Sequence, residues 1–171
     1  MKFIFAVLSV FFVSMPPCLA RDLLGAGEPG EDQAYNVTFG FSPFDGFIGF
    51  EYQYGKHSFG IGAPGRFSYR HYADEFSDSL FWGVYLGQDS YDENNETVDG
   101  HLYRAFETEY FGFGMGKRWQ WPSGWHVNLS AAIEHYEEEY SNPEFPLNGA
   151  SWKKKEEGFR LMPGFTVGYK F

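Results

Sequence analysis

The sequence predicts an all-β protein, an antiparallel up-and-down transmembrane β-barrel of eight strands, on three observations. Aromatic residues make up 22% of the chain and 21 of its 171 residues are glycine, which is unusual for a soluble domain. No segment after residue 20 approaches the run of about 20 apolar residues that a membrane helix needs. Bulky apolar residues instead alternate with small or polar ones, as in strands with two different faces. Because lipid offers no partner to an open strand edge, such strands must close into a barrel.

The amino-terminal segment has the composition of a secretory signal. Lys2 gives a positive start, residues 3–13 are apolar, and Ala20 is a small residue suited to signal peptidase. We therefore predict a signal peptide over residues 1–20, a leader rich in glycine and acidic residues over 21–33, and the barrel over 34–171. Cys18 is the only cysteine of the chain, so cleavage removes the only thiol.

The first five strands are read from alternation in the amino-terminal half. They are expected over residues 35–42, 48–54, 59–63, 67–72 and 80–86. The boundary at Ala63-Pro64-Gly65 is ambiguous, because a turn there gives eight strands and a bulge gives seven. Bacterial single-chain barrels have even strand numbers, so we predict eight.

The last three strands alternate more regularly, over residues 110–119, 125–134 and 159–171, with a tight turn at 121–124. The polar stretches 89–102 and 141–156 are expected to be surface loops at one end of the barrel. The final strand ends on an aromatic residue and carries four apolar side chains on one face. This pattern is similar to the assembly signal of outer-membrane barrels, and its residues are Phe165, Val167, Tyr169 and Phe171.

Alternation alone does not reveal which face points inward, and a lipocalin-like soluble barrel would turn the same aromatic residues inward. Two observations favour lipid around the bulky apolar face. The other face is rich in glycine, and the connections are short at one end of the barrel and long and polar at the other. The interior of an eight-stranded barrel is just wide enough to be filled by side chains. On this assignment the charged residues of the inward face are Glu51, Arg66, Arg70, Arg104, Arg118, Glu134, Arg160 and Lys170. Buried charges must pair, so we expect a structural ion-pair network; the alternative is a narrow channel.

In its signal, its terminal strand and its loop asymmetry, the chain resembles the small eight-stranded outer-membrane barrels of the OmpX and OmpA transmembrane-domain type. The resemblance concerns architecture over residues 21–171. Proteins of this broad class include adhesins, structural anchors and lipid-modifying enzymes, so the fold leaves the function open.

One segment supplies an enzymatic alternative. His135-Tyr136 followed by Tyr140-Ser141-Asn142 resembles the His-x-Ser-Asn signature of the lipid A 3-O-deacylases, which would make His135 and Ser141 catalytic with Glu156 as the orienting acid. Six residues of extended strand separate the histidine from the serine, about 20 Å, which exceeds hydrogen-bond reach. The alternative therefore needs a chain that folds back between them.

The formal net charge of −10 excludes binding of nucleic acid through a phosphate-neutralising surface. Histidines 57, 71, 101 and 126 are scattered along the sequence, so no metal and no cofactor is predicted. The expected partners are outer-membrane lipid, lipopolysaccharide and the barrel-assembly machinery. The sequence thus predicts a monomer of the bacterial outer membrane with a structural or surface-interaction role.

Overall fold

The computed structural model of the chain describes residues 33–75, 78–98, 101–141 and 153–171, with the backbone alone for 91–98, 101–105 and 153. Residues 34–171 form one compact unit. The predicted signal peptide and nearly all of the predicted leader lie outside the described residues. They therefore stay predictions.

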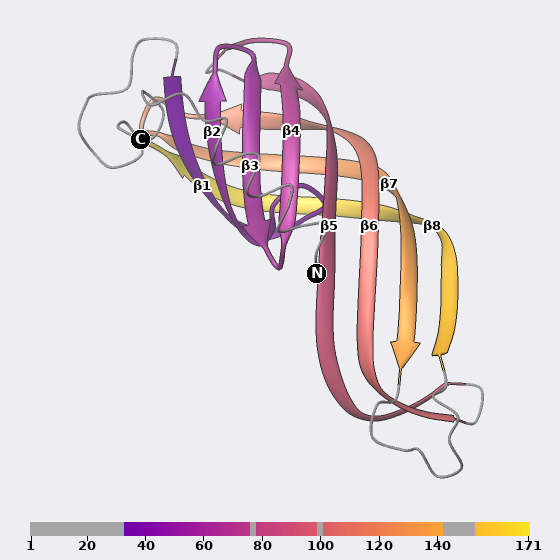
Figure 1. The fold of residues 1–171 in the computed structure, drawn as a ribbon. Coiled ribbons are helices and arrows are strands. Elements are labelled where there is room, and N and C mark those ends of the chain that lie inside the picture. Colours follow the sequence, from indigo (N-terminus) through magenta and orange to yellow (C-terminus); the bar gives the residue numbers. More distant parts are fainter. Residues whose placement is uncertain (1–32, 76–77, 99–100, 142–152) are drawn as a thin grey trace, which may run out of the picture. The chain divides into compact units, whose positions relative to one another are not determined.

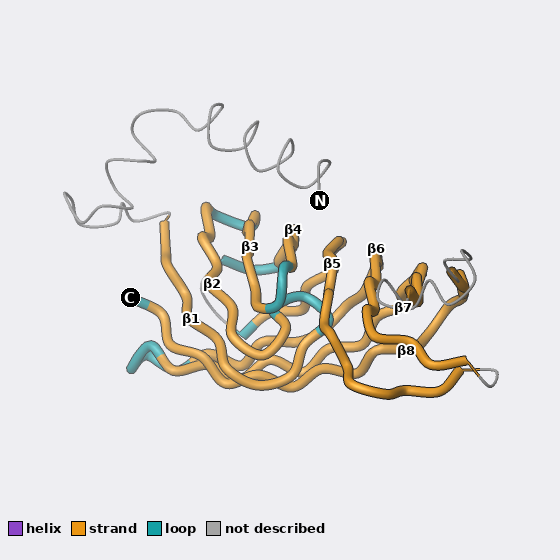
Figure 2. The backbone as a smooth tube through the Cα atoms, turned by 60° about the horizontal axis from the view of Figure 1, so that its bottom comes forward, coloured by secondary structure: helices purple, strands orange, loops and turns teal. Residues whose placement is uncertain are grey.

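Eight antiparallel strands close into a barrel in which each strand pairs with its neighbours in sequence and the first pairs with the last. The predicted all-β fold with eight strands is confirmed, and the ambiguous segment at Ala63 is the connection between the third and fourth strands. The strands are β1 (Gln33–Ser42), β2 (Gly46–Tyr54), β3 (His57–Ala63), β4 (Arg66–Tyr72), β5 (Ser79–Val98), β6 (His101–Gln120), β7 (Trp125–Ser141) and β8 (Lys153–Lys170). Figure 2 traces this wall, in which short turns join most neighbouring strands.

The two halves of the barrel differ in strand length. Strands β1 to β4 have 7 to 10 residues, whereas β5 to β8 have 17 to 20. The register of β4 with β5 ends at the pair of Arg66 and Gly87, and that of β1 with β8 ends at Phe41 and Phe165. Beyond these pairs β5 to β8 continue as a four-stranded sheet, visible in Figure 1 as strands that run past the ends of β2 to β4. We call residues 88–98, 101–109, 137–141 and 153–157 the projecting sheet.

The projecting sheet corrects one prediction. Residues 89–102 and 141–156 were expected to be surface loops, but most of the described residues among them are strand. The acidic residues in these stretches have low strand propensity, and the stretches show no apolar alternation, so their sequence carries no strand signal. Pairing with neighbouring strands holds them extended nevertheless.

The barrel is polar inside and apolar outside. Its buried side chains are mostly polar or charged, among them Glu51, Arg70, Arg118 and Glu134 at 1% exposure or less. Large apolar side chains are exposed on the outer surface of every strand except β4, as at Phe39, Ile61, Phe113 and Leu161. In β4 the outward Phe67 and Tyr69 are half-buried. The soluble alternative, in which these aromatic residues fill the interior, is therefore wrong about the direction of the two faces.

Several inward glycines provide room for large inward side chains on neighbouring elements. A Cβ atom at Gly83 would lie 2.8 Å from the ring of Phe44, and one at Gly116 would lie 2.5 Å from the ring of Phe81. Both rings belong to a small aromatic cluster inside the barrel. An eight-stranded barrel can hold these rings only where the position that each ring covers carries no side chain.

Candidate functional site: the polar interior

Glu51 lies at the centre of the interior and accepts hydrogen bonds from two arginines. Its Oε2 atom is 2.6 Å from Arg70 Nη1 and 2.7 Å from Arg118 Nη2, and all three side chains are about 1% exposed. The Tyr72 hydroxyl donates to the same carboxylate at 3.2 Å, and Asn36 Nδ2 donates at 3.5 Å. The carboxylate thus has four donors, which is what a charge removed from water requires.

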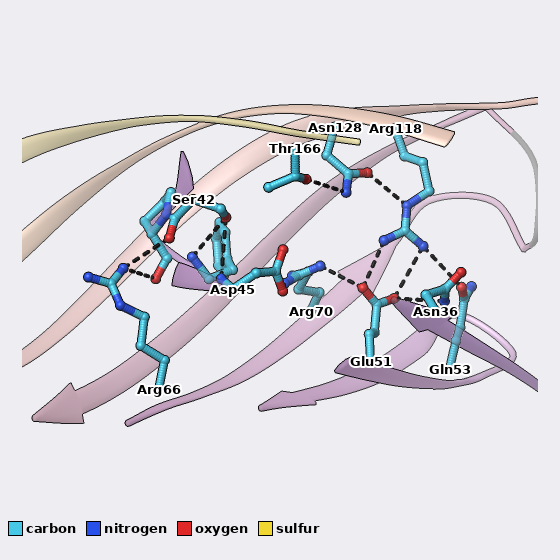
Figure 3. A network of polar contacts seen from close by, with 12 residues as sticks. Asn36, Ser42, Asp45, Glu51, Gln53, Arg66, Arg70, Arg118, Asn128 and Thr166 are labelled. Carbon is cyan, nitrogen blue, oxygen red and sulfur yellow. Dashed lines mark hydrogen bonds and ion pairs between the residues drawn. The ribbon is translucent and has the colours of Figure 1, made fainter. Parts of the chain in front are cut away.

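Arg118 carries this cluster across the barrel to the opposite wall. Its Nε atom donates to Asn128 Oδ1 at 2.8 Å, and Asn128 Nδ2 donates in turn to Thr166 Oγ1 at 3.0 Å. On the other side, Arg118 Nη1 lies 3.4 Å from Gln53 Oε1. Figure 3 shows the continuous chain of contacts that results. We call it the interior network: Asn36, Asp45, Glu51, Gln53, Arg70, Tyr72, Arg118, Asn128 and Thr166.

The connection between β1 and β2 folds into the barrel and supplies a further acid. Residues 43–45 are buried, and the Ser42 hydroxyl accepts hydrogen bonds from the backbone N–H groups of Phe44 and Asp45 at 3.0 and 3.3 Å. The turn leaves through Gly46, whose φ of +66° suits glycine. Asp45 pairs with Arg70, and Phe44 packs edge-on against Phe81 at 5.6 Å. We call residues 43–45 the inward turn. It fills the barrel interior next to Glu51, since Arg70 pairs with both Asp45 and Glu51.

Arg66 fixes the inward turn from the opposite wall. Its Nη1 atom donates to the carbonyl oxygens of Ser42 and Pro43 at 2.9 and 3.0 Å, and its guanidinium lies 4.7 Å from the ring centre of Tyr110. Arg66 thus compensates its charge with carbonyl dipoles and an aromatic face.

A second ion pair lies toward the projecting sheet. Glu134 is fully buried, and its Oε1 atom is 2.6 Å from Arg160 Nη2, whose side chain is 36% exposed. Arg160 also approaches Glu138 at 3.6 Å and the ring of Tyr136 at 5.0 Å. This pair is therefore partly hydrated, in contrast to the pairs around Glu51.

The two remaining charged residues of the predicted inward set are Lys170 and Arg104. Lys170 is the last residue of β8, partly buried and in register with Asn36. Arg104 falls within β6, and its side chain lies outside the described part of the chain.

Sequence reasoning missed Asp45. The predicted inward set held six cations and only two acids, and this surplus was the available signal that a connection must contribute a carboxylate.

The proposed catalytic residues are not brought together. His135 and Ser141 lie on one uninterrupted strand, β7, and the chain does not fold back between them. The His135 ring is flanked by Phe111 at 5.1 Å and Phe159 at 5.0 Å on the outer face. Glu156 is in register with Glu138 and bonds Lys154 at 2.6 Å. Because an extended strand of six residues spans about 20 Å, these three residues do not form a catalytic triad.

The outward residues of the final strand are all at least 36% exposed: Phe165, Val167, Tyr169 and Phe171. Among the described residues no helix is both long and apolar enough to cross a membrane. No protein-family model, curated protein or solved structure matches the chain. The interior geometry and the polarity of the two faces are therefore the features that bear on the function.

Proposed function

We propose that the protein is a monomeric outer-membrane β-barrel with a closed interior and a structural or surface-interaction role. The observation that carries the proposal is the abrupt end of the outer apolar surface on the side of the projecting sheet. The last row before the change joins three apolar residues and one histidine, whose ring lies between the two phenylalanine rings: Leu86, Phe111, His135 and Phe159. The next outward row toward the projecting sheet is polar on all four strands: Gln88, Glu109, Glu137 and Glu157. A surface in uniform solvent has no reason to change polarity between two successive register rows on four strands.

The height of the apolar surface suits a bilayer. Along β7 it runs from Trp125 to His135, ten residue steps, which is ~33 Å of strand. At a strand tilt of about 40°, this corresponds to ~25 Å along the barrel axis, the usual height of the lipid-facing band of outer-membrane barrels. Lys117 is also on the outer face, near the end of β6, and its Nζ atom lies 5.2 Å from the ring centre of Trp119. A lysine beside a tryptophan suits the lipid–water interface.

The geometry of the interior favours a barrel that is closed by its own side chains over an open channel. The interior network and the inward turn connect side chains from β1, β2, β4, β6, β7 and β8 across the interior. A permeating ion would have to break pairs whose members are almost completely buried, at a high free-energy cost. The part of the protein able to meet other molecules is then the projecting sheet. Outer-membrane lipid, lipopolysaccharide and the barrel-assembly machinery are the partners that this location implies.

A pair of arginine substitutions on the outer face tests the membrane location. Phe113 is 52% exposed in the apolar surface, whereas Ser90 is exposed on the same face of the projecting sheet. In lipid, Phe113→Arg should cost about 2–4 kcal/mol, because the charge faces the apolar core of the bilayer. Ser90→Arg should cost little. The measurement is the fraction of full-length protein in outer-membrane fractions of a Gram-negative host that migrates as the compact unboiled form on a gel.

The proposal requires a compact form in the membrane fraction that Phe113→Arg depletes and Ser90→Arg preserves. A soluble protein that tolerates both substitutions equally would overturn it, because in water an exposed phenylalanine gains nothing over arginine. Stable conductance of the purified barrel in a planar bilayer would overturn the closed interior while leaving the location intact.

A further inference from the structure

Two histidines that are 14 positions apart in sequence lie directly opposite each other on the outer face. His57 is the first residue of β3, and its register partner in β4 is His71. His57 is exposed and His71 is half-buried, and neither belongs to the interior network. Their separation in the sequence does not indicate this pairing, so the scattered appearance of the histidines was misleading for these two.

Their backbone position brings the two side chains close together. The N–H of Tyr72 donates to the carbonyl of Lys56 at 2.8 Å, which marks these two residues as a hydrogen-bonded pair of the ladder. In an antiparallel ladder such pairs alternate with non-hydrogen-bonded pairs. His57 and His71, one step further along, therefore form a non-hydrogen-bonded pair, the kind in which facing side chains approach most closely.

The separation of the two rings fits a shared metal ion. Their centroids are 5.0 Å apart, with an angle of 58° between the ring planes. A metal lies about 2.0–2.1 Å from an imidazole nitrogen, and therefore about 3.2 Å from the ring centroid. Two imidazoles that bind one ion thus have centroids about 4.5 Å apart at the 90° angle that Cu²⁺ prefers and about 5 Å apart at a tetrahedral angle. The observed spacing requires no movement of the backbone.

Tyr69 orients one of the two rings. A hydrogen bond of 2.8 Å joins its hydroxyl to His57 Nδ1. With Nδ1–H as the donor, the lone pair of Nε2 is left for a metal ion, which is how a neighbouring acceptor usually orients a metal-binding histidine. The His71 ring packs against Trp82 at 5.6 Å, which restricts its orientation too.

We propose that His57 and His71 form a binding site for a divalent first-row transition-metal ion. Among the described residues no third histidine, cysteine or carboxylate joins them, so water would complete the coordination. Imidazole ligands suit Cu²⁺, Ni²⁺ and Zn²⁺, and among these an open two-histidine site binds Cu²⁺ most tightly. The proposal rests on the pairing of β3 with β4 and uses no residue of the interior network.

The test is a titration of untagged full-length protein in detergent micelles with Cu²⁺ alone, followed by isothermal calorimetry and by electron paramagnetic resonance. His57→Asn and His71→Asn each remove one ligand, and each should weaken this site at least about tenfold. Tyr69→Phe removes only the orienting hydroxyl and should weaken it by about tenfold or less. His135→Asn is the matched control, because His135 is an outward histidine between two phenylalanines.

The proposal expects one Cu²⁺ equivalent with the resonance pattern of two nitrogen ligands, lost in both ligand variants and retained in His135→Asn. It is overturned if the wild-type protein and His57→Asn bind Cu²⁺ with the same affinity and stoichiometry, or if His135→Asn loses the ion as well. Should His71→Asn fail to give the compact gel form, His57→Asn decides, because His57 is exposed beside a turn.

Discussion

The halves of this barrel formed by β1–β4 and by β5–β8 use the same strand geometry for different purposes. The short strands end where the inward turn and the interior network close the barrel. The long strands share that closed region and then continue as the projecting sheet, in which both faces carry polar residues such as Glu109 and Glu138. Comparing β1–β4 with β5–β8 shows that the length of a strand and the polarity of its two faces are set independently. Length follows backbone pairing, whereas polarity follows what each face meets.

The largest effect that would test this comparison is the loss of Glu51. Glu51→Gln leaves two fully buried arginines without their shared carboxylate, and we expect a loss of about 3–5 kcal/mol in unfolding free energy. Glu134→Gln is the counterpart nearer the projecting sheet, where Arg160 is partly exposed and can regain water, so its cost should be ~1–2 kcal/mol. Urea unfolding in micelles, followed by tryptophan fluorescence, measures both. Equal costs would mean that the two regions are equally shielded from water.

The inward turn should give the second-largest effect. Phe44→Ala removes a buried ring that packs on Phe81, and we expect a loss of ~3 kcal/mol, the low end for a buried phenylalanine because a turn can adjust. Phe47→Ala, three residues later, removes an exposed outward ring and should change stability far less. The same urea titration compares the two variants. A larger loss for Phe47 would show that the turn does not support the interior.

The smallest effect is expected in the projecting sheet. Glu109 is in register with Glu137, and Glu137 with Glu157, so three like charges face each other across neighbouring strands. Glu109→Lys replaces one of the two like-charge contacts in this row, that with Glu137, by an attractive pair and should stabilise the sheet by about 0.2–1 kcal/mol. Slower hydrogen exchange at the amides of residues 107–111 and 135–139 would show it. The gain should shrink in 1 M salt, because exposed charges are screened; faster exchange in the variant would contradict this account.

The fold could be predicted wherever the two faces of a strand differ chemically. Alternation between aromatic and small residues identified the strand that contains Phe113 and the one that contains Phe165. The count of eight followed from the even strand number of bacterial single-chain barrels. The same reasoning failed in residues 89–98, 101–102, 141 and 153–156, the described parts of the two predicted loops, since two polar faces produce no alternation. Local sequence carries no sign there of the long-range pairing that keeps the chain extended.

The interior was only partly predictable. Strand parity points Glu51, Arg70 and Arg118 to one side, but it does not say which residues meet across the barrel. The direction of the turn that carries Asp45 depends on tertiary contacts, such as the bonds from Arg66 to its carbonyl groups.

The histidine pair depended on one residue of register. A two-residue turn at Pro64-Gly65 would place His57 opposite Tyr72. The observed pairing of Gly62 with Arg66 leaves a three-residue connection and places His57 opposite His71. A shift of one residue in register changes every pairing between two strands. The pattern of residues in the sequence therefore could not predict that His57 lies opposite His71.

The glycines that face large interior rings have a consequence for how this barrel can diverge. Gly83 accommodates Phe44, and Gly116 accommodates Phe81, at distances that leave no room for a methyl group. A Cβ atom would also meet a backbone carbonyl oxygen, that of Tyr69 at Gly83 and that of Leu129 at Gly116, so a smaller ring alone does not make room for a larger residue. A smaller ring leaves a cavity. Both glycines should therefore stay unchanged in diverging copies of the gene, and the rings that face them should shrink only at a cost in stability.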